Sequence, residues 1–214
     1  MSKDTKEKIL TAALEMFAQN GYAATNIREL LASLGMGKSS MYRHYESKDE
    51  VWNAVIDMME TYYEERFGSS ANLPPIPEST AELKELTLRM LGFTMHDEKI
   101  ILTRKILLTE QFHDERVRRE ATKHFNEGLE NMFTEIFSRM MEKGVLRADD
   151  SRMLAFSYTA PISTLVQLCD REPEREDEIM EMIRGFIDHF IKTYEGYSGN
   201  CQGISGFSSR GEKT

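Results

Sequence analysis

Apolar residues recur at every third or fourth position along most of this 214-residue chain, and no stretch alternates apolar and polar residues as a half-buried strand does. The most regular stretch runs from 114 to 143, and its apolar face is formed by Val117, Ala121, Phe125, Leu129, Met132, Ile136 and Met140. Because this spacing places side chains on one face of an α-helix, we expect an all-α fold of about nine helices.

One proline-rich break divides the helical pattern. Residues 68–80 contain three of the five prolines together with glycine and serine, a composition typical of a loop. Before it we expect a first unit over 1–48, which continues to about 63 within a linking helix over 49–67. After it, a second unit over 81–195 is expected to hold helices near 81–94, 98–108, 114–143, 150–170 and 173–194. Residues 196–214 have the glycine- and serine-rich composition of a disordered tail.

The charge balance limits how this chain could meet nucleic acid. It has 40% hydrophobic and 29% charged residues, as a globular protein does, and a formal net charge of −9. Residues 1–50 contain equal numbers of acidic and basic residues, so the excess acid lies in the remainder. A protein that coats nucleic acid with its whole surface is therefore excluded, whereas a small DNA-binding unit on an acidic body is compatible with the pattern.

Export, membrane insertion and disulfide formation are not indicated by the sequence. The N-terminus is charged from its third residue, and no apolar stretch approaches the roughly 18 residues of a membrane span. Cys169 and Cys201 lie far apart and outside any C-x-x-C pair, so they predict neither a disulfide framework nor a zinc site. We expect a cytoplasmic protein without membrane contact.

Residues 26–48 carry the most informative local pattern. Asn26 can cap a short helix that ends at Gly35, and a second short helix is expected over 38–44. Ser47 has a glutamate three residues later, the spacing of a capping box that starts the next helix. Such a pair is typical of a helix-turn-helix, whose second helix can lie in the major groove of DNA. Short apolar helices with glycine between them are also common in ordinary cores, so this pattern alone is weak.

Three motifs make the pattern specific: IL-x-AA-x-x-x-F at 9–17, GY-x-x-T at 21–25 and KSSMYRHYESKDEV at 38–51. With them, roughly the first 60 residues resemble the TetR family of bacterial transcriptional repressors, while the remainder is similar only in length and helix layout. The resemblance implies a homodimeric, ligand-responsive transcriptional regulator, which a small-molecule inducer releases from a palindromic double-stranded DNA operator. A TetR-like protein that binds a ligand without DNA activity is an alternative.

The resemblance also implies which residues contact DNA. Thr25 and Lys48 would contact phosphates, Lys38, Ser39, Ser40 and Arg43 would reach base edges or the groove, Arg28 would lie near the groove edge, and Tyr42 and His44 would hold the DNA backbone. The expected phosphate contact of Lys48 gains from the N-terminus of the helix that it begins. Arg28 and His44 could equally be surface residues without a DNA contact, and Tyr42 could simply pack.

Three residues depart from the family pattern. Gly37 stands where a Ser or Thr usually caps the recognition helix, which weakens that cap by about a few tenths of a kcal/mol. Leu31 and Leu34 occupy positions that are commonly alanine, where the two short helices cross. Because larger side chains can shift the recognition helix, the operator sequence does not follow by analogy.

The second unit would bind the inducer and form the dimer. From chain position and polarity, the candidate ligand-binding residues are Tyr62, Phe93, His96, Arg104, Phe112 and Phe133. Methionine and phenylalanine at helical spacing are also common in cores, so apolar residues alone do not identify a pocket. The helices near 150–170 and 173–194 carry apolar stripes too broad for one neighbour, which predicts a four-helix bundle across the two-fold axis of a homodimer.

Two His-Asp pairs offer an alternative of a different class. His96-Asp97 and His113-Asp114 resemble the ligand pairs of metal-dependent helical hydrolases. Such a site needs a further histidine and a distant aspartate as ligands, and Asp97 and Asp114 also suit the N-caps of the helices that follow them. We therefore expect no enzyme, no catalytic residue, no metal and no cofactor.

Overall fold

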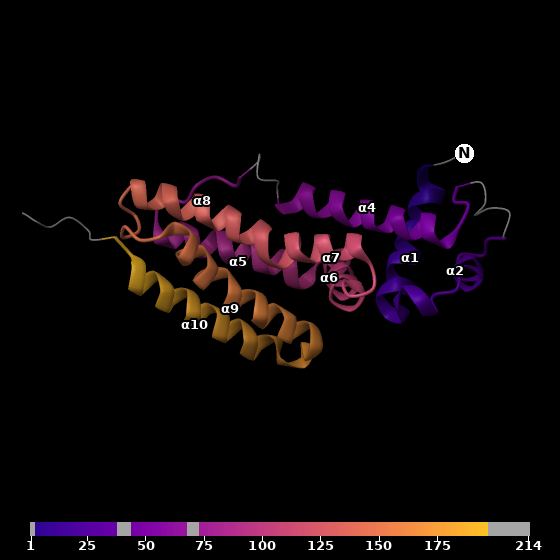
Figure 1. Cartoon of the computed structure of the whole chain (residues 1–214). Coiled ribbons are helices and arrows are strands. Elements are labelled where there is room, and N and C mark those ends of the chain that lie inside the picture. Colours follow the sequence, from indigo (N-terminus) through magenta and orange to yellow (C-terminus); the bar gives the residue numbers. More distant parts are fainter. Residues whose placement is uncertain (1–2, 38–43, 68–72, 197–214) are drawn as a thin grey trace, which may run out of the picture.

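The computed structural model describes residues 3–37, 44–67 and 73–196. These residues form an elongated, all-helical molecule (Figure 1). Within the described ranges no extended strand is present, and an isolated bridge joins Leu146 to Glu195. The recognition helix predicted over 38–44 lies outside the described residues except for His44, as does the tail predicted over 196–214 except for its first residue.

Three described helices form the end at the right of Figure 1, here called the head: α1 (Lys3–Ala24), α2 (Ile27–Ser33) and α4 (Lys48–Phe67). The chain breaks its helical path at Gly21, whose φ of 74° is easy only for glycine. Two predicted caps are confirmed. The Asn26 side-chain oxygen accepts the N–H of Arg28 at 2.9 Å, and the Ser47 hydroxyl accepts the N–H of Glu50 at 3.1 Å.

Residues 73–196 are here called the body, and their α-helices are α5 (Thr80–His96), α6 (Glu98–Glu110), α7 (Glu115–Thr122), α8 (Gly128–Glu142), α9 (Ser151–Arg171) and α10 (Glu176–Tyr194). Aspartates begin three of them. Asp97 accepts the N–H of Ile100 at 3.1 Å, Asp114 accepts the N–H of Val117 at 3.1 Å, and Asp150 caps α9. The N-cap alternative for the two His-Asp pairs is therefore confirmed.

The helix predicted over 114–143 is not one regular α-helix. A π-helical turn, Lys123–Glu127, separates α7 from α8. The apolar spacing of three or four residues continues through it, so the sequence pattern did not distinguish it from α-helix. The apolar side chains on its two sides face different cores. Val117 before the turn is buried with the head helices, whereas Ile136 after the turn is buried with the body helices. We call this segment the π-turn.

The described residues bury two separate apolar clusters. The head core joins residues of α1, α2 and α4 to Ile106 and Leu107 of α6 and to Val117 and Ala121 of α7. The body core joins α5, α8, α9 and α10. In Figure 1, α6 and α7 lie between these two groups. The packing therefore does not divide at the proline-rich break, because two helices that follow the break complete the head.

Candidate DNA-binding head and ligand cavity

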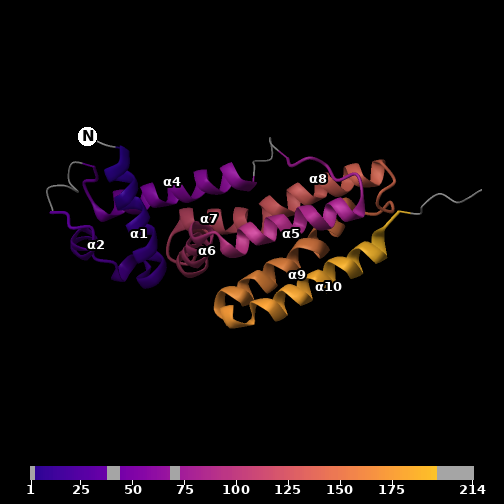
Figure 2. The same ribbon diagram turned by 180° about the vertical axis from the view of Figure 1, so that it is seen from behind.

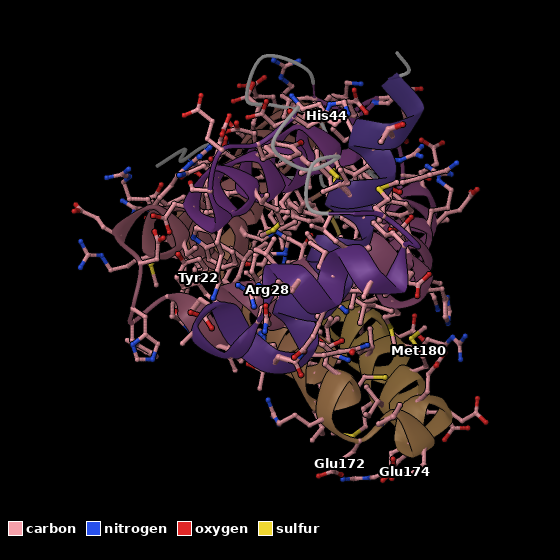
Figure 3. All side chains as sticks on the ribbon, turned by 90° about the vertical axis from the view of Figure 1, so that its right-hand side faces the viewer. Tyr22, Arg28, His44, Glu172, Glu174 and Met180 are labelled. Atoms are coloured by element: carbon pink, nitrogen blue, oxygen red, sulfur yellow. The ribbon has the colours of Figure 1, made fainter. Side chains whose placement is uncertain are left out.

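Described residues of the head flank, in the sequence, the segment expected to contact DNA. Leu30 and Leu31 of α2 are buried with Tyr45. Tyr45 is 2% exposed and lies shortly before α4, which begins at Lys48. Arg28 is exposed on α2 and His44 is half-buried on the other side of the segment; both are visible at the head end of the molecule in Figure 3. Residues on both sides of 38–43 in the sequence, Leu31 and Tyr45, are thus packed into the head core.

Lys38, Ser39, Ser40, Tyr42 and Arg43 lie outside the described residues. Their assignment to base edges, groove or DNA backbone stays a prediction from the resemblance.

Thr25 does not have the position predicted for it. It is 3% exposed, and its hydroxyl donates to the carbonyl of Gly21 at 2.8 Å. A second carbonyl, that of Met16, lies 3.2 Å away. The side chain therefore secures the connection from α1 to α2, and its burial keeps it from a DNA phosphate.

Lys48 begins α4, as predicted, and also contacts the end of α1. Its Nζ donates to the carbonyl of Ala23 at 3.2 Å and lies 4.4 Å from the centre of the Tyr22 ring. The hydroxyl of Tyr22 donates to Asp49 on the same turn of α4, and this hydrogen bond is the first cause that raises the pKa of Tyr22 to about 12. Lys48 thus has a structural contact within the head besides its place at a helix N-terminus.

Two carboxylates at the connection from α6 to α7 hold the head. Glu110 Oε1 accepts the backbone N–H of Tyr22 at 3.0 Å, and Asp114 Oδ2 accepts the indole N–H of Trp52 at 2.8 Å. A Cβ atom at Gly21 would lie 2.8 Å from Glu110 Oε1, so a side chain there would push this carboxylate away from its position. We call Glu110 and Asp114 the clasp.

The clasp carboxylate Asp114 stays charged at neutral pH. Burial favours its neutral form, but the hydrogen bonds from Trp52 and from the N–H groups of Val117 and Arg116 outweigh burial and lower the pKa of Asp114 below its usual value. The Trp52 ring also packs at 4.9 Å from that of Phe17. Hydrogen bonds to a charged group are among the stronger ones, so the clasp is a firm link between body and head.

A cavity of about 80 Å³ lies where α4, α5, α6, the π-turn, α8 and α9 meet. Its lining is mostly apolar, with Met90, Leu91, Phe125, Leu129 and Ile162 among the contributing side chains. An apolar cavity with a small number of polar groups is the usual form of a small-molecule site.

Two of the six predicted ligand-binding residues, Arg104 and Phe133, line this cavity. Arg104 is 3% exposed, and its Nε and Nη2 donate to the carboxylate of Asp170 at 2.7 and 2.6 Å. Its Nη1 donates to the carbonyl of Thr94 at 2.6 Å. The buried guanidinium is therefore paired within the protein.

The other four predicted residues lie elsewhere. His96 is exposed and bonds Glu176 at 2.7 Å, the Tyr62 hydroxyl donates to Asp97 at 2.7 Å, Phe93 lies 5.5 Å from the guanidinium of Arg66, and Phe112 is 83% exposed. These four residues do not line this cavity, because chain position indicates the region of a helix and not the direction of a side chain.

The cavity contains polar residues that the sequence analysis missed. Tyr63 adjoins the predicted Tyr62, and His124 lies in the π-turn; both line the cavity. Burial lowers the pKa of His124 to about 3, and the charge of Arg104 adds to this shift. Burial raises the pKa of Tyr63 to about 12. Both side chains are therefore uncharged at neutral pH. No clear signal in the sequence marked His124, because it lies one position before Phe125 of the predicted apolar face.

No helix in the described ranges is long and apolar enough to cross a membrane. The same ranges contain no cluster of three or more His, Cys, Asp or Glu side chains placed to hold a metal ion.

Two family models match the chain. The model of bacterial regulatory proteins of the tetR family matches residues 9–55, and the model of the AefR-like transcriptional repressor C-terminal domain matches residues 81–196. The chain is 26% identical to the HTH-type transcriptional regulator AcrR of Shigella flexneri over 52% of this chain and 50% of AcrR. It thus spans about half the length of that relative.

Two further comparisons cover more of the chain. It is 27% identical to the nucleoid occlusion factor SlmA of Escherichia coli over 74% of this chain and 79% of SlmA. The structure of SmeT, the repressor of the Stenotrophomonas maltophilia multidrug efflux pump SmeDEF, aligns with a TM-score of 0.64 at 18% identity, covering 90% of this chain and 91% of SmeT. This structural likeness confirms the all-α fold. With matched models at both ends, one of which spans more than half of its length, the chain belongs to the tetR family of bacterial regulatory proteins.

Proposed function

We propose that the protein is a ligand-responsive DNA-binding transcriptional regulator, a repressor that a small-molecule inducer releases by occupying the cavity. The observation that carries this proposal is the double role of α6. Ile100 and Arg104 of this helix line the cavity, and Ile106 and Leu107 of the same helix lie in the head core. A ligand that shifts α6 therefore acts on the head.

The clasp extends this connection to the backbone of the head. Through Glu110 and Asp114, the end of α6 and the start of α7 hold Tyr22 and Trp52. To release the protein from DNA, a ligand needs only to bind more tightly to the arrangement in which the two heads do not fit DNA than to the arrangement in which they do. A coupling of about 1–3 kcal/mol, typical of allosteric proteins, would lower DNA affinity about 5- to 150-fold.

The dimer is proposed from the apolar surface of the last two helices. Figure 2 shows α9 and α10 side by side along one side of the body. Met153 and Phe156 of α9 are 60% and 53% exposed, and Met182 of α10 is 50% exposed. Pairing of these faces across a two-fold axis would form a four-helix bundle. The two heads would then enter major grooves one helical turn, or a multiple of it, apart on a palindromic operator.

This proposal keeps the predicted division into a DNA-binding unit over 1–48, a linking helix over 49–67 and a ligand-binding and dimerisation unit over 81–195. It assigns the DNA contacts to the predicted residues other than Thr25, and it places the protein in the cytoplasm, where its DNA target would be. The hydrolase alternative is not proposed, because Asp97 and Asp114 serve as N-caps.

A mobility-shift assay on the promoter next to the protein's own gene tests the proposal. We expect a sequence-specific shift that a subset of small molecules reverses. Replacing Arg43 by Ala should relax specificity at one base pair of each half-site. The matched Arg89→Ala change removes an exposed arginine of α5 that pairs with Glu85, and it should leave DNA binding unchanged. The proposal would be contradicted if the protein bound ligands but did not bind the promoter DNA when unrelated duplex DNA was added as competitor. That result would favour a ligand binder without DNA activity.

A further inference from the structure

We infer that the cavity takes an uncharged, largely apolar molecule with one hydrogen-bonding group, which pairs with the imidazole of His124. This inference rests on the proposed function, because it names the class of inducer for the same cavity. It is argued from the charges and hydrogen bonds of the cavity lining.

The lining offers no unbalanced charge to a ligand. Among the described residues of the lining, Arg104 is the one that carries a full charge at neutral pH, and the carboxylate of Asp170 accepts two of its N–H groups at 2.6 and 2.7 Å. In the part of the chain that the structure describes, no aspartate or glutamate lines the cavity. Because an ion loses its hydration on burial, an anionic ligand would find its partner already neutralised, and a cationic ligand would find no partner.

His124 provides a polar group without a protein partner. In the described part of the chain its ring contacts Tyr63, at 4.3 Å between ring centres, and Phe125, at 5.0 Å, and no hydrogen bond reaches either ring nitrogen. The neutral imidazole has one donor and one acceptor nitrogen. The His124 side chain is half-buried at the cavity, so a ligand hydroxyl or carbonyl at this position can pair with a ring nitrogen that has no hydrogen bond to a described residue.

The other polar groups near His124 are engaged differently. The hydroxyl of Tyr158 shares a hydrogen bond with that of Thr87 at 2.8 Å, and the Thr159 hydroxyl donates to the carbonyl of Ala155 at 2.9 Å. These pairs lie within the protein and do not require a ligand. Ser163 and Gln167 of α9 also line the cavity. The polar anchor is assigned to His124 because this residue lies in the π-turn, between the helices of the two cores.

The π-turn gives this anchor a connection to the head. Phe125 follows His124 in the turn, lines the cavity and packs against the head core. A ligand group that pairs with His124 thus lies at the junction of the two cores. The anchor would position the ligand where it touches the segment between α7 and α8.

Direct binding of matched probes tests the inference without reference to DNA. The probes are naphthol, naphthalene, naphthoate and naphthylmethylamine, which share one ring system and differ in charge and hydrogen bonding at neutral pH. We expect calorimetric titration of the full chain to show the tightest binding for naphthol. Naphthoate and naphthylmethylammonium should bind at least about tenfold more weakly, because each would bury an unpaired charge.

Two variants locate the anchor. Replacing His124 by Phe keeps a ring of similar shape and removes both nitrogens. It should weaken naphthol about five- to tenfold, the effect of one net hydrogen bond, and leave naphthalene unchanged. The matched His113→Phe change makes the same replacement at an exposed histidine outside the cavity and should change neither probe. If His124→Phe proves unstable, His124→Gln retains a donor and an acceptor and should bind naphthol better than His124→Leu.

Tight binding of naphthoate or naphthylmethylammonium by the wild-type chain would overturn the uncharged class. Equal loss of naphthol and naphthalene in His124→Phe would overturn the anchor, because it would indicate a change of cavity shape. Failure of the proposed function is distinguishable: the probes would then bind as expected while the protein's complex with promoter DNA did not respond to them, or did not form.

Discussion

The head core and the body core are both built from buried apolar side chains, but they are completed in different ways. The head core takes residues from α6 and α7, which belong to the other side of the proline-rich break. The body core is built from α5, α8, α9 and α10, together with Leu146 of the connection between α8 and α9, and it adjoins the cavity that His124 lines. The difference indicates that the head depends on the body for its packing, whereas the body retains space for another molecule.

The largest expected effect comes from one change made in both cores. Ile106 in the head core and Ile136 in the body core are each 0% exposed. Replacing either by Ala should lower the free energy of unfolding by about 2–5 kcal/mol, because each change leaves a cavity in a packed core. Hydrogen exchange should separate them: Ile106→Ala should speed exchange in α1 and α4, and Ile136→Ala in α9 and α10. Faster exchange of α9 and α10 in Ile106→Ala, with α1 and α4 unchanged, would assign α6 to the body.

The clasp should contribute the next largest effect. Replacing Glu110 by Ala removes the acceptor of the Tyr22 N–H and should lower the free energy of unfolding by about 1.5–3 kcal/mol, as for other hydrogen bonds to charged groups. Glu110→Gln retains an acceptor oxygen and should recover most of this loss. The matched Glu174→Ala change, at an exposed glutamate, should have little effect in chemical denaturation. Equal stability of Glu110→Ala and wild type would remove Glu110 from the link.

Acid should lower the free energy of unfolding through His124, which lines the cavity. An unfolded histidine has a pKa near 6.5, whereas burial lowers the pKa of the folded His124 to about 3. Below about pH 6.5 the His124 side chain binds a proton in the unfolded state but not in the folded state. The free energy of unfolding therefore decreases as the pH is lowered. Between pH 7 and pH 5 this should amount to about 2 kcal/mol. The measurement is the difference between wild type and His124→Phe in urea unfolding at both pH values; a constant difference would contradict the shift.

The smallest expected effect is at the surface of the head. Replacing Lys48 by Ala should lower the slope of log affinity against log salt by about 0.9 for each head, the value for one phosphate contact. The alternative follows from its bond to Ala23: the slope would stay constant and only the stability of the head would fall. Titration of operator DNA at several salt concentrations, with a parallel denaturation curve, distinguishes these outcomes.

Much of the fold could be predicted from local chemistry. Asn26, Ser47, Asp97 and Asp114 are short polar residues that satisfy the free N–H groups at the start of a helix, and this bond needs only neighbours in the chain. The positive φ of Gly21, 74°, is also a local property, because glycine adopts it without the strain that a Cβ atom would cause. Helix starts and stops are therefore well indicated by the sequence.

The candidate site could be predicted less well, because it depends on which way side chains point. Tyr62 and Tyr63 are adjacent and chemically alike, yet only Tyr63 lines the cavity. Consecutive residues of an α-helix point about 100° apart, so an error of one position exchanges the cavity for another surface. Phe112 follows α6 and was expected inside, but the connection to α7 leaves it exposed. The inward direction of His124 depends on the π-turn, which has the apolar spacing of an ordinary helix.

The π-turn also sets the rotational phase between the two halves of the molecule. A π-turn holds one residue more than the α-helical turn it replaces, and one residue corresponds to about 100° of rotation around a helix. Removal of a single residue from 123–127 would turn the apolar stripe of α7 by that angle relative to α8. Val117 and Ile136 could then no longer face their separate cores together. The length of this segment, more than its composition, thus keeps head and body in register.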